Sequence, residues 1–352
     1  SSGFSRMDAS TLWGFNTLDL SNCSTLSGVS GTSPINFERA FYQPGYGSEL
    51  RIVNLENATN TAGEPNMVLD LSNFTKITDI NIRNSSVGSI ALPSTPLVSL
   101  DIVGSLLSSL NLSEQNLLEE IDVTGCSKLT TLYVSSCHNI SEVKGLNGLG
   151  NLTSVNINNC NVSELTISSC SSLVSISIDE EALETLEITN CSSLTTLNLA
   201  GCKNLKSIKV NDCAALTSIT FSPIADGDTW MANLESLDIS NTNIKSVKFG
   251  IIENTSILNL ATFTSLSDFK CSGDPSIEYI RFANIKSRAI PLTHSFYGCD
   301  NLTRIYGHVV VTNDYTSGRG SFSSCSKFSI HGSTFHGQSI LNGNVFKMPQ
   351  EI

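Results

Sequence analysis

The stretch from Leu183 to Cys213, LETLEITNCSSLTTLNLAGCKNLKSIKVNDC, repeats one apolar string three times. In each copy an apolar residue is followed by an apolar-x-apolar pair, and a cysteine stands three places after that pair. In a short β-strand the two apolar residues of such a pair point to one face and the residue between them points to the other. Copies begin 11 residues apart, at Leu183, Leu194 and Leu205. Self-similarity at a fixed period indicates a repeat array.

The same period extends far beyond this stretch. Apolar-x-apolar pairs begin at 69, 80, 90, 100, 110, 121, 132, 143, 155, 165, 176, 186, 197, 208, 219, 237, 247, 258, 269 and 280. A unit of 11 residues is too short to wrap once around a core, whereas two units supply one coil. The sequence therefore predicts a mostly β solenoid with little helix. We expect about ten coils of roughly 21–22 residues, each carrying two short parallel strands on opposite faces.

The residue three places after each pair occupies a turn. In most copies it is Cys, Ser, Thr or Asn, small groups that can hydrogen-bond to the backbone where the chain leaves the strand. Stacked thiols such as Cys170 and Cys191 fall within the Cα range of a disulfide, but their parallel side-chain directions favour buried thiols. The spacing resembles neither a zinc site nor a disulfide framework. We therefore assign structural turn roles to Cys126, Cys137, Cys160, Cys170, Cys191, Cys202 and Cys213.

Two resemblances follow from these strings. The central string resembles the leucine-rich repeat pattern L-x-x-L-x-L-x-x-N/C-x-L in its cysteine-using form. The segments 295–305 and 321–330 resemble the F-x-x-C-x-x-L-x-x-I element of BspA-like leucine-rich repeats, a family of bacterial surface proteins. The resemblance implies export, surface display, and adhesion or protein binding.

The pattern divides the chain into three segments. Residues 1–65 keep only fragments of the string and predict an irregular N-terminal cap, because an array must cover its terminal apolar face. Residues 66–284 form the predicted leucine-rich-repeat solenoid. Residues 285–352 form the predicted BspA-like repeats and C-terminal cap.

Charge and motif content exclude several function classes. The net charge of −12 argues against nucleic-acid binding, which needs cations to neutralise phosphates. No apolar run is long enough to span a membrane. Nucleophile elbows, P-loops, H-E-x-x-H strings and dinucleotide-binding glycine motifs are absent from the sequence, so we expect neither an enzyme nor a cofactor. Ser1–Arg6 lacks signal-peptide character. We expect an extracellular or outer-surface protein, lipid-anchored through a removed N-terminal segment.

One predicted face of the solenoid carries most of the strand charges. Its central outward residues are Asn81, Asp101, Asp122, Lys144, Thr166, Glu187, Lys209 and Asp238. Those of the opposite face are Asp70, Ala91, Asn111, Tyr133, Asn156, Ser177, Asn198 and Thr220. Solenoids bind ligands across such extended surfaces. Asp101, Asp122, Lys144, Glu187 and Lys209 are therefore the candidate ligand face, and an ordinary solvated surface is the alternative interpretation.

The strand positions at 219 and 237 are 18 residues apart rather than 11, which predicts a loop between them that contains Trp230. Loops on a rigid scaffold often carry function, so Trp230 is a candidate ligand contact. The alternative is that Trp230 folds back over the core. His331 and His336 lie at a spacing that suggests turns, and we predict no metal site there.

These observations favour a non-catalytic adhesion or protein-interaction module, whose partner would be a protein or another host-surface ligand. Two alternatives remain open. One is a glycan-binding module, although exposed aromatic residues are scarce. The other is a parallel β-helix enzyme that cleaves polysaccharides with stacked carboxylates, although such a fold normally has three strands per coil.

Overall fold

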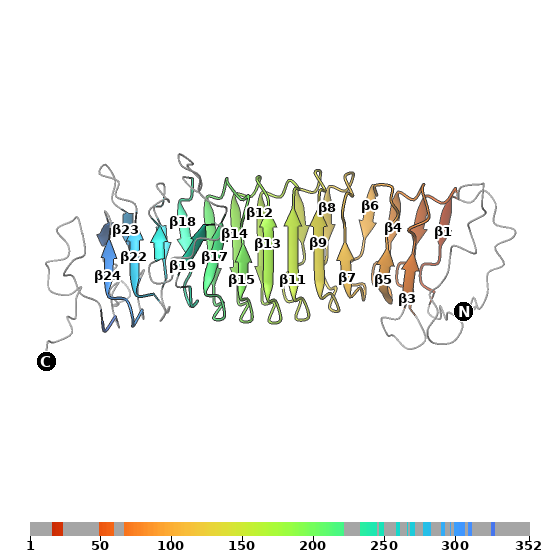
Figure 1. Cartoon of the computed structure of the whole chain (residues 1–352). Coiled ribbons are helices and arrows are strands. Elements are labelled where there is room, and N and C mark those ends of the chain that lie inside the picture. Colours follow the sequence, from red (N-terminus) through yellow and green to blue (C-terminus); the bar gives the residue numbers. More distant parts are fainter. Residues whose placement is uncertain are drawn as a thin grey trace. The chain divides into compact units, whose positions relative to one another are not determined.

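The protein is a β solenoid whose coils carry two parallel strands each (Figure 1). The computed structural model describes residues 16–23, 49–59, 67–221 and 233–244, with short segments and single positions between 246 and 327. These described residues form strands and turns and contain no helix. The predicted fold class is confirmed. The chain forms two compact units, Ser1–Val162 and Ser163–Ile352.

In the first unit the strands alternate between two faces. Face A carries β1, β2, β4 and β6 in one sheet and β8 and β10 in another, whereas face B carries β3 with β5 and β7 with β9 and β11. All pairs are parallel. The bounds are β1 (Thr17–Asp19), β2 (Ile52–Asn54), β3 (Met67–Asp70), β4 (Asp79–Asn81), β5 (Val87–Ala91), β6 (Ser99–Asp101), β7 (Ser109–Asn111), β8 (Glu120–Asp122), β9 (Thr131–Ser135), β10 (Glu142–Lys144) and β11 (Ser154–Asn158).

In the second unit face A carries β12, β14, β16, β18 and β21, and face B carries β13, β15, β17 and β19. Smaller sheets follow, formed by β20, β22 and β24 and by β23 and β25. The bounds are β12 (Glu164–Ser168), β13 (Ser175–Asp179), β14 (Thr185–Thr189), β15 (Thr196–Asn198), β16 (Ser207–Asn211), β17 (Ser218–Phe221), β18 (Ser236–Asp238), β19 (Ser246–Phe249), β20 (Leu258–Leu260), β21 (Asp268–Lys270), β22 (Tyr279–Phe282), β23 (Ile290–Leu292), β24 (Arg304–Tyr306) and β25 (Val309–Val311).

Every strand position predicted between 69 and 280 falls inside one of the strands β3 to β22. The strict alternation between faces does not hold throughout. On face A, β18 pairs with β21, so two consecutive strands, β19 and β20, come between neighbours where alternation predicts one. The 11-residue period locates a strand but carries no information about which sheet receives it.

Repeat structure begins inside the segment predicted to be an irregular cap. β1 and β2 pair with each other in register, and β2 pairs with β4, so Leu18, Val53 and Ile80 stack as inward residues. β23, β24 and β25 likewise extend the parallel pairing into residues 285–352. The boundaries at 65 and 284 stay predictions, and they do not coincide with the division between the two compact units.

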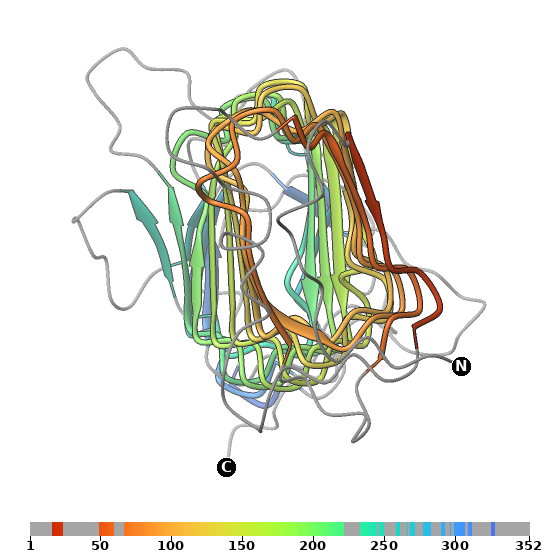
Figure 2. The ribbon, with the colours of Figure 1, turned by 90° about the vertical axis from the view of Figure 1, so that its right-hand side faces the viewer.

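The core of each unit consists of the inward residues of both faces. In β14, Leu186 and Ile188 are fully buried, and so is Leu183, which points inward from the preceding corner. Burying each such side chain contributes about 1.5–3 kcal/mol. Within each unit, Figure 2 shows the strands of the two faces on opposite sides of the core. Each repeated string therefore supplies one half of the core of a coil.

Most corners turn through one residue with positive φ, which stands directly before the buried turn residue. Asn is frequent there and Gly serves in other coils, because these residues tolerate the left-handed conformation. In the first unit the asparagines also bond to one another, since Asn57 donates to Asn22 at 3.1 Å and Asn84 donates to Asn57 at 3.3 Å. This conformation sets the direction in which the chain leaves each strand.

Two glycines with positive φ, Gly145 and Gly148, differ in the space available for a side chain. Gly145 has φ +80° and a Cβ there would collide with the backbone N and Cα of Thr124, whereas Gly148 has φ +74° and a Cβ there would meet nothing within 4 Å. We expect Gly145→Ala to lower the free energy of unfolding by more than about 2 kcal/mol and Gly148→Ala by about 1 kcal/mol. Urea denaturation of both variants measures the difference. Equal losses would contradict the proposed packing at Gly145.

Candidate interaction surface

The five candidate face residues all lie on face A, in two groups. Asp101, Asp122 and Lys144 belong to the first unit, where Lys144 is in register with Asp122. Glu187 and Lys209 belong to the second unit, where they are in register with each other. All five are partly exposed, and each has a buried residue on at least one side in the sequence. The structure thus places each on the predicted face and groups them by unit.

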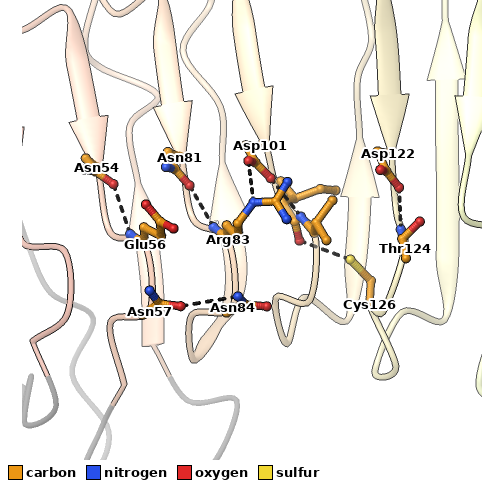
Figure 3. Close-up of polar contacts among 12 residues, drawn as sticks. Asn54, Glu56, Asn57, Asn81, Arg83, Asn84, Asp101, Asp122, Thr124 and Cys126 are labelled. Carbon is orange, nitrogen blue, oxygen red and sulfur yellow. Dashed lines mark hydrogen bonds and ion pairs between the residues drawn. The ribbon is translucent and has the colours of Figure 1, made fainter.

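Side-chain oxygens at the central outward position often bind the backbone and end the strand there. In the first unit the acceptors Asn54, Asn81, Asp101 and Asp122 each receive the N–H group two residues later, at 2.8–3.2 Å (Figure 3). The strands that contain them end at these residues. The same bond, called an Asx turn, ends β1, β3, β7, β15 and β18.

Four strands whose central outward residue makes no such bond continue further. Tyr133, Thr166, Glu187 and Lys209 stand at the centre of five-residue strands. In β11 the Asn156 side-chain oxygen accepts from the Asn158 side chain instead, at 2.5 Å, and that strand also runs for five residues. Many Asp and Asn residues of the surface therefore terminate strands.

Asp101 is engaged within the chain through both carboxylate oxygens. One oxygen accepts the Val103 N–H at 3.2 Å, and the other accepts from Arg83 Nε at 2.7 Å. This hydrogen-bonded ion pair raises the pKa of Arg83 above its ordinary value. Figure 3 shows Arg83 reaching from its own turn to the next strand. Asp101 is thus a structural residue of this surface, which its isolated place in the sequence does not reveal.

Lys144 lies among carboxylates on β8 and β10. Its Nζ is 2.6 Å from Glu120 and 3.1 Å from Glu142, two glutamates that are neighbours in register. The hydrogen bonds to Glu120 and Glu142 raise the pKa of Lys144. Sequence reasoning missed both glutamates because it considered only the central outward residue of each strand. The period of two applied to both sides of Ile121 and Val143 would have found them.

In the second unit, charges of alternating sign form two columns on face A. Lys209 pairs with Glu187 at 2.7 Å and is in register with Asp238 on its other side. Lys206 pairs with Glu184 at 2.7 Å in the parallel column. The hydrogen bond to Glu187 raises the pKa of Lys209. These side chains are between 39% and 51% exposed, so the ion pairs are open to solvent and individually weak.

Face B contrasts with face A in charge. Of its central outward residues from Asp70 to Thr220, only Asp70 carries a charge. Tyr133 is its one large exposed aromatic side chain within the described residues, and is 37% exposed. The two faces of the solenoid therefore present different chemistry to solvent.

The turn cysteines lie at corners, and each thiol donates to a backbone carbonyl. Cys170, Cys191 and Cys213 donate to the residue two places earlier, whereas three others donate to the preceding coil. Cys126 donates to Ile102 O at 3.2 Å, Cys137 to Leu112 O at 2.5 Å, and Cys202 to Ile178 O at 3.5 Å. All eleven cysteines lie at described positions and are thiols, and nine of them are buried. Each acceptor carbonyl in a preceding coil belongs to the second inward residue of that coil on the same face.

Residues other than cysteine at the turn position also form buried hydrogen bonds at the corner. Gln115 accepts the Leu97 N–H at 2.7 Å and donates to Pro93 O at 3.4 Å. Ser105 stands one coil before Cys126, and their side chains meet at 3.7 Å. Burial raises the pKa of Cys126, and raises that of Cys202 to about 12. These thiols therefore stay protonated at neutral pH, which suits a donor to a carbonyl.

Trp230, His331 and His336 lie outside the described residues. Across the part of the chain that the structure describes, no group of three or more His, Cys, Asp and Glu side chains is arranged to hold a metal ion. Nor does any helix long and apolar enough to cross a membrane occur in that part.

Neither a protein-family model nor a curated protein sequence matches the chain. Among solved structures it is similar to the functional domain of InlJ from Listeria monocytogenes, which includes a cysteine ladder (15% identity, 85% of this chain and 70% of that one, TM-score 0.20). It is also similar to a leucine-rich cell surface protein from Faecalibacterium prausnitzii (14%, 88% and 89%, 0.24). A leucine-rich repeat protein from Bacteroides ovatus is a third example (15%, 83% and 83%, 0.20). No functional conclusion rests on likenesses at these identities and TM-scores.

Two substitutions of Asp122 separate its hydrogen bond from its charge. Asp122→Asn keeps an oxygen that can accept the Thr124 N–H, whereas Asp122→Ala removes it. We expect Asp122→Ala to lower the free energy of unfolding by about 1 kcal/mol and Asp122→Asn by less than about 0.5 kcal/mol. Urea denaturation checks both values. If the two variants lost equal stability, the carboxylate charge rather than the turn would be the stabilising feature.

The raised pKa of Cys202 predicts a loss of stability at alkaline pH. Unfolded cysteine ionises near pH 8.5, whereas burial raises the pKa of Cys202 to about 12 in the folded chain. Its contribution is full below about pH 8.5 and is lost as pH rises towards 12. We expect Cys202→Ala to make the fall of unfolding free energy between these limits shallower, by up to about 1.4 kcal/mol per pH unit.

Urea denaturation of this variant at a series of pH values measures that slope. Cys137→Ala is the matched control, because a hydrogen bond with Cys160 lowers the pKa of Cys137 at the corresponding turn of the first unit. An unchanged slope in Cys202→Ala would show that ionisation of this thiol is not linked to folding.

Proposed function

We propose that the chain is a non-catalytic leucine-rich-repeat protein that mediates adhesion or protein–protein interaction at the outer surface of a bacterial cell. Anchoring through a lipid-bearing N-terminal segment belongs to this proposal. The sequence resemblance to surface-displayed repeats supports the location. The contrast between a charged face A and a nearly uncharged face B supports binding through face A.

The observation that carries the proposal is the pair of charge columns in the second unit. Parallel pairing holds Glu187, Lys209 and Asp238 in register, so successive charges repeat at about the 4.8 Å spacing between strands. Glu184 and Lys206 repeat the alternation beside them. A rigid lattice of alternating charges selects partners whose own charges match its spacing. Exposed ion pairs are weak enough to exchange for such a partner.

The fixed hydrogen bonds of the acidic residues argue against the polysaccharide-cleaving alternative. Both oxygens of Asp101 are bound within the chain, and one oxygen of Asp122 holds the Thr124 N–H. A general acid or base needs a carboxyl oxygen that can exchange a proton with substrate. Tyr133 offers a single stacking surface for a sugar on face B, which supplies limited support for glycan binding.

A binding screen with purified chain tests the proposal. Surface plasmon resonance against immobilised extracellular-matrix proteins and host-cell glycans identifies a binder, and a polysaccharide panel reports any cleavage. Lys209→Glu places like charges beside Glu187 and Asp238, and we expect it to weaken protein binding at least tenfold, or about 1.4 kcal/mol.

Two further variants refine the result. The exchange Glu187→Lys with Lys209→Glu retains an ion pair but inverts the pattern, so we expect it to weaken binding while preserving stability. Ser177→Glu alters face B and should leave affinity within about twofold. If the Lys209→Glu variant and the charge-exchange variant both bound the protein partner as the wild type does, face A would not be the binding surface. Binding to glycans alone would favour the alternative, and cleavage of any polysaccharide would overturn the proposal.

A further inference from the structure

Cys271 and Cys299 form a thiol pair unlike the other turn cysteines. Their Sγ atoms lie 3.7 Å apart, and Cys299 also donates to the backbone carbonyl of Cys271 at 3.0 Å. Both side chains are fully buried. They belong to the second unit, where Cys271 directly follows β21 and Cys299 lies at a turn before β24.

The repeat explains why these two thiols meet. At several corners the turn cysteine donates to the carbonyl of the second inward residue of the preceding coil, as Cys126 does to Ile102 and Cys202 does to Ile178. Cys299 follows the same rule, and its acceptor residue is Cys271. At this coil the second inward position therefore holds a thiol where most other coils hold Ile, Leu, Val or Phe.

The pair differs from cysteines that share one repeat position. Cys170, Cys191 and Cys213 follow strands in register, so their side chains leave the backbone in parallel directions. Parallel side chains one strand spacing apart are poorly placed for the near-perpendicular torsion of a disulfide. Cys271 comes from an inward strand position and Cys299 from a corner. Their side chains therefore approach each other from two different backbone sites.

We propose that Cys271 and Cys299 form a disulfide under oxidising conditions and are the redox-active pair of this protein. The sulfur atoms are already in contact and must approach by about 1.6 Å to reach the bonded distance of about 2.05 Å. The tilted contact between Phe269 and Phe296, with ring centroids 6.1 Å apart, holds the two coils together beside them.

The oxidant belongs to the class of small disulfides such as oxidised glutathione. One cysteine thiolate attacks this disulfide, forms a mixed disulfide and releases one small thiol. The second cysteine thiolate then attacks the mixed disulfide, forms the Cys271–Cys299 bond and releases the second small thiol. The cysteines lose two protons and two electrons, which reduce the small disulfide to two thiols. Because both residues are buried, the reaction requires local opening of the turn.

The disulfide would join two successive coils covalently. It closes a loop between positions 28 apart in the sequence and links the segment predicted as solenoid to the segment predicted as BspA-like repeats. Cross-links of this length stabilise a fold chiefly by restricting its unfolded state. Oxidising compartments such as a cell surface maintain such bonds.

Thiol counting on the purified full chain tests the proposal. Reduced protein is incubated with oxidised glutathione, both in native buffer and in urea below the unfolding transition, and is then alkylated in denaturant. We expect nine alkyl groups in the intact mass, two fewer than the eleven cysteines, and a linked peptide pair containing Cys271 and Cys299. The oxidised protein should unfold on the order of 5 °C above the reduced protein.

Three variants make the result specific. Cys271→Val places at this position the residue type found at Val134 and Val210, and Cys299→Ser keeps a donor for the carbonyl. Each should retain all ten remaining thiols after oxidation and show no thermal shift. Cys191→Ala is the control and should still lose two thiols. Eleven alkyl groups in wild type under both conditions, or a linkage mapped to any other pair, would overturn the proposal.

Discussion

The architecture depends on pairing every backbone group of a very short strand with the coil before and after it. Strands of three to five residues contribute few hydrogen bonds each, so the corners must also pair their N–H and C=O groups. Three devices do this. A residue with positive φ redirects the chain, a small buried group reaches the preceding coil, and an Asx side chain binds the N–H group two residues on.

This requirement explains why chemically different residues share the turn position. Cys126, Ser105 and Gln115 all supply a polar atom to a buried corner, although one is a thiol, one a hydroxyl and one an amide. What the corner selects is hydrogen bonding in a small space. A cysteine at this position therefore implies no redox function by itself, and the pair at Cys271 stands out because its two sulfurs come from different repeat positions, one inward on a strand and one at a corner.

The sequence predicted strand positions well because alternation and period are properties of the string itself. Leu186 and Ile188, the apolar pair of one copy, are both buried, as the pattern predicts for the pair of every copy. It could not predict that β20 follows β19 without an intervening strand on face A, because the sheet that receives a strand is chosen by tertiary pairing. Nor could it show that Asp101 pairs with Arg83, since that contact joins neighbouring coils through side-chain torsions. The five face residues lie on the strands where the pattern puts them, whereas their ion-pair partners are visible only from the strand register, and their role as a ligand face stays a prediction.

The two-strand coil has a consequence for how such a gene can change length. Loss or duplication of a whole coil, about 22 residues, preserves the register of everything downstream, so recombination between copies yields a chain that still folds. Where strands alternate strictly between the faces, as they do from β3 to β19, loss of a single half-unit transfers the strands that follow it to the opposite sheet. The charge columns that contain Glu187 and Lys209 would then pass to the other side of the molecule with their sequence unaltered. Deletions in steps of one coil therefore conserve the surface, whereas deletions in steps of half a coil invert it.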